Sequence, residues 1–344
     1  MSKKYLVIGS GGREHAIAWA LSRDSESYVL PGNPGMVQDA QTVSGNPNDF
    51  EFVAKKAKEL EIDTVVIGPE DPLCAGIADV LEKHGLKVFG PKKTASKLEG
   101  SKVFAKEFMK KHGIPTANSE VFSNEKDALE FIKKLIFPVV IKVDGLAAGK
   151  GVQIVYNMFD AESVLHGIFS DCKFGASGEQ IVIEEFLVGK ELSILGVTDG
   201  NVIKPLPHSR DHKQLLDGNR GPMTGGMGAF CPVPGISSEL FETIRTTILE
   251  KTLEGLKKDG IPYKGVIFFG LMLTDDGPKV LEYNCRFGDP ETQVVLMQIE
   301  TPLSEIVDAV VDEKLSDLEI KVKKGFLQQL FWHRKVIPIN QKRV

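Results

Sequence analysis

Residues 280–291, with the sequence VLEYNCRFGDPE, limit the possible fold and function of this chain more than any other stretch. If they form an extended strand, in which alternate side chains share a face, Glu282, Asn284 and Arg286 lie on one face and the intervening residues on the other. A carboxylate and an amide oxygen are hard ligands that suit Mg²⁺, and a guanidinium group can hold a phosphoryl oxygen. A solvent-facing edge strand is the simpler interpretation, but a turn with two further carboxylates, Asp289 and Glu291, follows at once. We therefore predict that this stretch forms the metal- and phosphate-binding edge of an ATP site.

Composition limits the classes of partner. A chain of 344 residues, 42% of them hydrophobic, has enough apolar side chains for two or three domains with cores of their own. A net charge of -5 favours small-molecule partners, because nucleic acid and anionic membranes both need clustered Lys and Arg. The four cysteines and seven histidines lack metal-site or disulfide-framework spacing, and the first apolar run is too short for a signal peptide or a membrane span. We expect a cytoplasmic monomer with no nucleic-acid or membrane partner.

The N-terminal part has the pattern of an open parallel α/β sheet. Residues 5–8 form a short apolar run that leads into the glycine-rich turn of residues 9–16 and a helical pattern through Leu21. Such a turn aims backbone N–H groups at an anion, but Glu14 stands where a dinucleotide motif has its third glycine, so the turn can also merely close a βα unit. Expected strands at residues 28–30, 64–67 and 87–89 alternate with helical stretches. Their loops, residues 31–35 and 68–73, should lie at the ligand-binding edge of the sheet.

Two lysines in the next part are candidate phosphate ligands. Lys106 lies on an expected amphipathic helix over residues 101–112, where a lysine is usually solvated. Lys142 interrupts an apolar strand over residues 137–143, and a buried ammonium group needs an anionic partner because its burial alone costs several kcal/mol. The glycine-rich loop of residues 144–152 follows and can fold over a triphosphate, although it lacks the Walker spacing.

A further strand ends in a segment that suits the base and ribose of a nucleotide. Residues 180–191 read QIVIEEFLVGKE, an apolar run followed by a polar–apolar hinge. Backbone groups in the hinge can pair with an adenine edge, and Glu191 is spaced to accept ribose hydroxyls. An exposed strand end is the alternative interpretation.

The order of these motifs resembles that of the ATP-grasp superfamily and, within it, the glycinamide ribonucleotide synthetase family, from about Lys4 to about Gly325. The segments that carry the resemblance are residues 9–16, 31–35, 145–152, 211–213, 221–229 and 282–291. The resemblance implies an N-terminal open parallel α/β sheet of the pre-ATP-grasp type, followed by a two-lobed ATP-grasp α+β fold. The expected parts are an N-terminal domain (1–100), a connecting helix (101–120), a lid (121–190), a central subdomain (191–325) and an aberrant tail (326–344).

The resemblance also implies a reaction, in which glycine is ligated to 5-phosphoribosylamine while ATP becomes ADP and phosphate, through glycyl phosphate. It implies Mg²⁺ or Mn²⁺ on Glu282 and Asn284, with Lys142 and Arg286 neutralising charge on the phosphoryl group. The residues expected at ATP are Lys106, Lys142, Gly149, Lys150, Gly151, Glu184, Glu185, Phe186, Leu187 and Glu191. Those expected at glycine and the sugar phosphate are Ser10, Gly11, Gly12, Arg13, Asp211, Lys213, Gly288 and Asp289.

Alternative functions stay open at this point. Another ATP-grasp carboxylate–amine ligase or carboxylase would share Lys142, Glu184 and Glu282 but not the N-terminal loops. A nicotinamide-dependent oxidoreductase is suggested by the N-terminal glycine turn alone. A shortened form that binds ATP but ligates little is a third alternative.

The resemblance ends near Gly325, and residues 326–344 differ from the continuation that the family leads one to expect. We hypothesise a frameshift, because a shifted reading of permitted codons from Phe326 can give FATTVLASQGYPDKSKKG, which is similar to that continuation. A natural short tail is the alternative. The hypothesis predicts exposed apolar side chains at Leu330, Phe331 and Trp332, a tendency to aggregate, and weak ligase activity.

Overall fold

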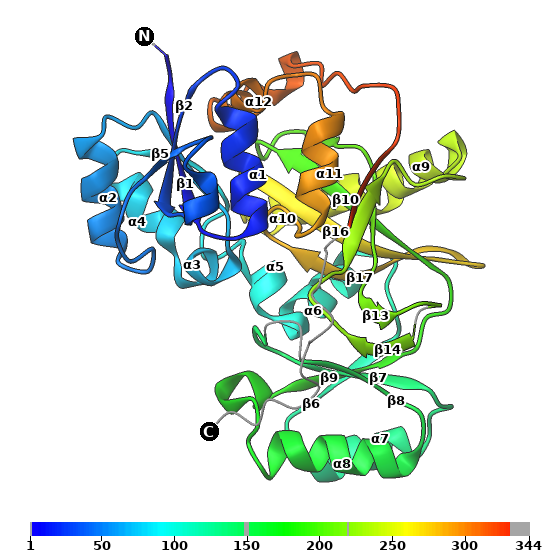
Figure 1. Ribbon diagram of the computed structural model, residues 1–344. Coiled ribbons are helices and arrows are strands. Elements are labelled where there is room, and N and C mark those ends of the chain that lie inside the picture. The colour runs from blue at the N-terminus through cyan, green and yellow to red at the C-terminus, as the bar shows by residue number, and fades with distance from the viewer. Residues whose placement is uncertain (1, 148–150, 219, 331–344) are drawn as a thin grey trace.

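The computed structural model describes residues 2–147, 151–218 and 220–330 (Figure 1). Its N-terminal part is a parallel sheet in the order β3-β2-β1-β4-β5. The strands are β1 (Lys4–Gly9), β2 (Glu26–Pro31), β3 (Gln41–Thr42), β4 (Thr64–Ile67) and β5 (Lys87–Phe89). The predicted parallel sheet is therefore confirmed, and β3 is an edge strand that the sequence pattern did not predict.

Strand β1 is buried on both faces, which explains its continuous apolar run. Tyr5 and Val7 belong to one core, and Leu6 and Ile8 belong to another on the opposite face. The second core is closed by α2 and α4, and the first by α1, α11 and α12. The helices of this part are α1 (Gly12–Leu21), η1 (Pro34–Met36), α2 (Phe50–Glu59), α3 (Glu70–Ala75), α4 (Ile77–Lys83) and α5 (Lys97–Gly100).

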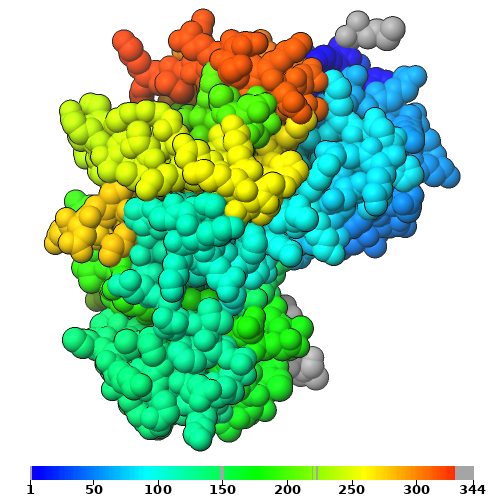
Figure 2. Space-filling model, turned by 180° about the vertical axis from the view of Figure 1, so that it is seen from behind, coloured from blue at the N-terminus to red at the C-terminus, as the bar shows by residue number. Residues whose placement is uncertain are grey.

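A second lobe lies at the bottom of the molecule in Figure 1 and also at the bottom in Figure 2. Its sheet has the order β6-β9-β7-β8 and is antiparallel throughout. Helices α7 and α8 pack on one face of this sheet around a core that includes Ile141, Leu165 and Ile183. The elements are β6 (Ser119–Phe122), α7 (Glu125–Ile132), β7 (Val139–Val143), β8 (Val152–Val155), α8 (Met158–Phe169), η2 (Gly175–Gly178) and β9 (Ile181–Glu185).

The central sheet has the order β11-β10-β16-β17. Strand β16 is paired on both sides, and its apolar run from Val266 to Leu271 is buried because a different core covers each of its two faces. Helix α6 (Lys102–His112), for which the Ser101 hydroxyl is the N-terminal cap, packs on this sheet together with α10. The other elements are β10 (Lys190–Thr198), β11 (Ile203–Pro205), α9 (Ser238–Ile244), the π-helical turn η3 (Arg245–Leu249), α10 (Glu250–Lys258), β16 (Gly265–Thr274) and β17 (Gly277–Asn284).

The remaining segments bring the end of the described chain back to the central part. Strand β18 (Leu327–Leu330) pairs with β15 (Gly228–Cys231), so the first residues of the predicted aberrant tail form a sheet edge. Phe331, Trp332 and the side chain of Leu330 lie outside the described residues, and their predicted exposure stays a prediction. The other elements are β12 (Arg210–Asp211), β13 (Gln214–Leu216), β14 (Arg220–Met223), α11 (Glu291–Gln298), α12 (Leu303–Val311) and η4 (Leu315–Asp317).

Candidate active site

Glu184 lies in the lobe formed by β6–β9 and forms ion pairs with two lysines. Its Oε2 is 3.0 Å from Nζ of Lys142, and its Oε1 is 3.2 Å from Nζ of Lys106. The three side chains are at most 9% exposed. Lys142 and Glu184 lie on neighbouring strands two register positions apart, and Lys106 reaches them from α6. The anionic partner predicted for Lys142 is thus supplied by the protein itself, and the usual solvated placement of a helical lysine is wrong for Lys106.

Burial is the largest influence on the pKa of Lys106. It lowers the pKa of this ammonium group to about 8, against the opposing attraction of Glu184. Nζ of Lys106 also donates to the Thr116 hydroxyl at 2.8 Å. A lysine with a lowered pKa and an incompletely balanced charge is suited to a further anionic ligand.

Lys142 connects this lobe to the strand of the predicted metal ligands. Its Nζ donates to the carbonyl oxygen of Leu281 at 3.1 Å. Leu281 lies in a β-bulge, because Gly270 pairs with Glu282 while Leu271 pairs with Val280. A bulge re-aims the side chains beside it, so the simple alternation predicted for this strand is interrupted at Leu281. Beyond the bulge the prediction is confirmed, since Tyr283, Cys285 and Phe287 are buried in the cores.

Glu282 carries a negative charge in a half-buried position among four cations. Burial alone would raise its pKa, but Lys213, Lys142, Lys102 and Arg286 together lower the pKa of this carboxyl below its usual value. Lys102 was missed in the sequence, although its place four residues before Lys106 puts both lysines on one face of a helix. Burial lowers the pKa of Lys102, which Glu282 opposes.

Glu282 and Asn284 fit a hard divalent cation by their chemistry. They offer a carboxylate and an amide oxygen near the end of β17, and the carboxylate stays ionised because of the surrounding cations. In the part of the chain that the structure describes, no group of three His, Cys, Asp or Glu side chains has the geometry of a metal site. A site with two protein ligands suits Mg²⁺, which keeps several waters and takes phosphate oxygens as further ligands.

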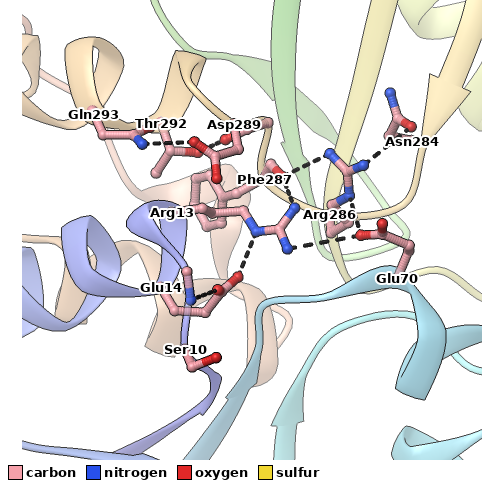
Figure 3. A network of polar contacts seen from close by, with 12 residues as sticks. Ser10, Arg13, Glu14, Glu70, Asn284, Arg286, Phe287, Asp289, Thr292 and Gln293 are labelled. Carbon is pink, nitrogen blue, oxygen red and sulfur yellow. Dashed lines mark hydrogen bonds and ion pairs between the residues drawn. The ribbon is translucent and has the colours of Figure 1, made fainter. Parts of the chain in front are cut away.

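Arg286 forms ion pairs with two carboxylates of the N-terminal part, of which Figure 3 shows Glu70. Its Nη2 is 3.0 Å from Oε1 of Glu99, and its Nε is 3.1 Å from Oε2 of Glu70. Glu99 also accepts a hydrogen bond from the backbone N–H of Cys285 at 2.7 Å. Burial lowers the pKa of Arg286, but Glu99 and Glu70 outweigh it and keep the guanidinium firmly charged. Neither glutamate was among the predicted site residues, although Glu70 lies in the loop of residues 68–73.

The predicted phosphate-binding turn faces the segment that follows β17. A methyl group on Gly12 would lie 3.1 Å from Nε2 of Gln293 and 3.9 Å from Oδ1 of Asp289. The structure thus brings residues 10–13 next to Asp289, as the substrate assignment expects. However, the backbone N–H of Gly11 already donates to Glu14 at 2.7 Å, and Arg13 is paired with Glu14 at 2.6 Å.

The turn is also fixed from the neighbouring strand, since the carbonyl oxygen of Ser10 accepts from Nδ2 of Asn33 at 2.8 Å. Asn33 belongs to the loop of residues 31–35, one of the segments that carry the family resemblance. Two loops at the carboxyl ends of neighbouring strands therefore contact each other, as expected for a parallel sheet.

Asp211 and Lys213 form a charged cluster with two glutamates. Nζ of Lys213 is 3.3 Å from Glu191 and 3.8 Å from Asp211. Burial raises the pKa of Glu291 to about 7, and the nearby Asp211 adds to this. The Ser193 hydroxyl donates to Glu291 at 3.2 Å. Glu191, predicted at the ribose, is therefore paired with a predicted glycine-site lysine, and Glu291 is a buried member of the cluster that the predicted site left out.

Most of the other residues that we predicted to bind the nucleotide lie at the end of β9 and in the segment that leads to β10. Glu185 accepts from the backbone N–H of Asn118 at 3.0 Å and lies 3.6 Å from Nζ of Lys279. Phe186 and Leu187 connect β9 to β10, and Leu187 is buried. Gly151 is buried and its carbonyl oxygen accepts from Val143 at 2.9 Å, whereas Gly149 and Lys150 lie outside the described residues. Gly288 has no room for a side chain, because a Cβ there would lie 2.5 Å from Oε2 of Glu291.

Two family models match this chain over successive stretches. The N domain of phosphoribosylglycinamide synthetase matches residues 3–99, and the ATP-grasp (A) domain of the same enzyme matches residues 100–292. The chain belongs to the phosphoribosylglycinamide synthetase family. The predicted resemblance and the predicted order of folds, a parallel N-terminal sheet followed by an ATP-grasp fold, are confirmed.

The sequences of curated relatives support this family membership. Phosphoribosylamine-glycine ligase of Clostridium acetobutylicum is 46% identical over 325 residues, which are 94% of this chain and 78% of that protein. The trifunctional purine biosynthetic protein adenosine-3 of Gallus gallus is 48% identical over 322 residues, which are 92% of this chain and 32% of that protein. The chain therefore spans about a third of the length of the chicken protein.

Solved structures show the same fold. Phosphoribosylamine-glycine ligase from Thermotoga maritima matches with a TM-score of 0.81 at 39% identity, covering 95% of this chain and 79% of that one. A biotin carboxylase complex from Campylobacter jejuni matches with a TM-score of 0.71 at 17% identity, covering 95% and 75%. The second match concerns the fold alone. Among the helices that the structure describes, none is long and apolar enough to cross a membrane.

Proposed function

We propose that the chain is an ATP-dependent ligase that joins glycine to 5-phosphoribosylamine, giving glycinamide ribonucleotide, ADP and phosphate. The observation that carries this proposal is the Glu282 carboxylate, whose pKa Lys213, Lys142, Lys102 and Arg286 together lower, on a strand that ends at Asn284. Such a set of fixed charges suits a metal-bound triphosphate, because preorganised cations stabilise the charge that moves during phosphoryl transfer. The family membership and the name of the Clostridium relative support the choice of substrates.

In this proposal the nucleotide lies between the β6–β9 lobe and β17. Lys142 and Lys106 would meet the phosphates, and the hinge at Phe186 and Leu187 would receive the base. The oxygens of Glu282 and Asn284 would hold Mg²⁺ or Mn²⁺, which when bound would neutralise phosphate charge and polarise the terminal phosphoryl group.

The chemistry needs no protein nucleophile. In the first step a glycine carboxylate oxygen attacks the terminal phosphorus of ATP, the bond to ADP breaks and glycyl phosphate forms. In the second step the amine nitrogen of 5-phosphoribosylamine attacks the carbonyl carbon, phosphate leaves and the nitrogen loses a proton. The protein contributes position and fixed charge to both steps. Asp211, Lys213, Gly288 and Asp289 would hold glycine, and the turn of residues 10–13 would hold the sugar phosphate.

The test is an isotope experiment with the purified chain. Glycine labelled with ¹⁸O in its carboxylate should yield inorganic phosphate that carries one ¹⁸O atom, with release of ADP that depends on both glycine and 5-phosphoribosylamine. Unlabelled phosphate would contradict a glycyl phosphate intermediate. Release of ADP that depends on bicarbonate in place of glycine would instead indicate a carboxylase of the same fold. Glu82→Gln, a change in a surface ion pair with Lys92, is the control that should keep full turnover.

A further inference from the structure

Glu70 lies between the two arginines of the candidate site, and the proposed function assigns it no role. It is the first residue of α3, the helix that follows β4. Its Oε2 is 3.1 Å from Nε of Arg286 and 3.7 Å from Nη2 of Arg13. One carboxylate oxygen therefore faces a guanidinium group from the phosphate-binding turn and another from the segment after the metal strand (Figure 3).

The two guanidinium groups also share a second acceptor. Nη1 of Arg13 and Nη1 of Arg286 donate to the same carbonyl oxygen, that of Phe287, at 3.3 Å and 3.2 Å. Their side chains are only 9% and 15% exposed, so water screens their mutual repulsion weakly. The negative charge of Glu70 offsets that repulsion, and its loss would leave the repulsion opposed between the two groups only by their shared acceptor.

Each arginine has in addition a carboxylate partner of its own. Nε of Arg13 is 2.6 Å from Glu14, and Nη2 of Arg286 is 3.0 Å from Glu99. In the ion pairs of the described residues, Glu14 and Glu99 each hold one of these arginines, whereas Glu70 joins the two pairs. A change at Glu70 therefore affects how the arginines are placed relative to each other, while each keeps a partner that preserves its charge.

We propose that Glu70 is a positioning residue that couples anion binding at residues 10–13 to the placement of Arg286 at the nucleotide phosphates. This inference rests on the proposed function. A phosphate group that pairs with Arg13 competes with Glu70 for that guanidinium and leaves the carboxylate to Arg286. Glu70 and Glu99 then hold Arg286 more firmly beside the metal strand. Sugar phosphate and nucleotide should therefore each strengthen the binding of the other, by the same factor in both directions.

Titration calorimetry with ribose 5-phosphate tests the proposal, because this compound carries the sugar and phosphate of 5-phosphoribosylamine but cannot react. Its Kd is measured with and without saturating Mg²⁺ and a non-hydrolysable ATP analogue. We expect the wild type to bind it at least about fivefold more tightly with the nucleotide present, the lower end of usual coupling. In Glu70→Gln, which keeps the shape but removes the charge, this ratio should fall to about one. Glu70→Asp should restore part of it, and the surface control Glu82→Gln should keep all of it.

A variant that has only lost stability would weaken both titrations equally and leave the ratio unchanged, which would count against the proposal. A wild-type ratio near one, or a wild type that does not bind ribose 5-phosphate, would also overturn it. The proposed function fails by a different observation, namely a wild type that makes no glycinamide ribonucleotide from glycine and 5-phosphoribosylamine. The two failures are therefore distinguishable.

Discussion

Replacing Lys142 with methionine removes one of the two ammonium groups that flank the Glu184 carboxylate. The sequence alone predicts that Lys142→Met is tolerated in folding, because methionine matches the shape of the lysine stem. The structure changes this expectation, because Glu184 is 2% exposed and would keep only Lys106, at 3.2 Å. Removing one partner of a buried ion pair costs about 3–5 kcal/mol. Because Lys106 stays in place, we expect a loss of about 2–3 kcal/mol in the free energy of unfolding.

A double-mutant cycle separates the pair from its surroundings. Glu184→Gln leaves both lysines without a carboxylate and should cost more than Lys142→Met. The double variant should be less destabilised than the sum of the two single variants by about 1–2 kcal/mol, the coupling expected for residues in contact. Urea unfolding followed by circular dichroism gives these values. Single-variant losses that add to within about 0.5 kcal/mol would refute the reasoning, because additivity is the behaviour of independent sites.

Nucleotide binding gives the second part of this prediction. Lys142→Met should weaken the binding of Mg-ATP by at least about tenfold, since a charge-assisted contact to a phosphate is lost. The control is Lys133→Met in the same lobe, whose ammonium group pairs with Glu130 on the surface and should change neither unfolding nor binding. If Lys142→Met binds Mg-ATP as tightly as the wild type in calorimetry, Lys142 is not a phosphate ligand.

Three further predictions concern the other side of the site. Glu282→Gln should keep the fold but lower turnover by several orders of magnitude, because the metal loses its charged ligand; near-normal turnover at millimolar Mg²⁺ would contradict this. Burial raises the pKa of Glu291 to about 7, so the stability that its protonated form contributes at pH 5 should be lost as the pH rises through 7. Glu291→Gln cannot ionise, and between pH 5 and pH 8 its stability relative to the wild type should rise by on the order of 2 kcal/mol, whereas a pH-independent difference would refute the shift. Gly288→Ala should lower the free energy of unfolding by about 1–3 kcal/mol, because its Cβ would lie 2.5 Å from Oε2 of Glu291, and an unchanged urea midpoint would show that Glu291 can move away.

Local patterns predicted four of the five strands of the N-terminal sheet. The apolar runs became β1, β2, β4 and β5 because each strand of a covered parallel sheet is buried on both faces, a constraint that leaves a continuous signal in the sequence. Strand β3 has two exposed residues, Gln41 and Thr42, and such a short edge strand carries no comparable signal. The lysine within β7 likewise indicated an anionic partner, because an unpaired buried charge is too costly to keep.

The partners of the charged residues could not be predicted in the same way. Glu99 and Arg286 are far apart in the chain, and their ion pair depends on how α5 packs beside the end of β17. Nothing in the residues around Glu99 distinguishes it from a solvated glutamate on a short helix. Lys102 differs, because its spacing from Lys106 was a usable signal. The monomeric state, the cytoplasmic location, the binding of Mg²⁺ or Mn²⁺ and the frameshift stay predictions.

The packing explains why the turn of residues 9–16 lies beside the segment that follows β17. Tyr5 and Val7 of β1 share a core with Val295 of α11 and Ile306 of α12, so the first strand and the helices after the metal strand bury one another. This places the first turn of α1 beside the first turn of α11, where Gly12 faces Gln293. Because apolar burial supplies most of the stability of such a core, the charged groups above it do not have to hold the two parts together. The Glu70 carboxylate between two arginines can therefore serve ligand binding as well as offset the repulsion between the guanidinium groups, and the titrations of Glu70→Gln test this role.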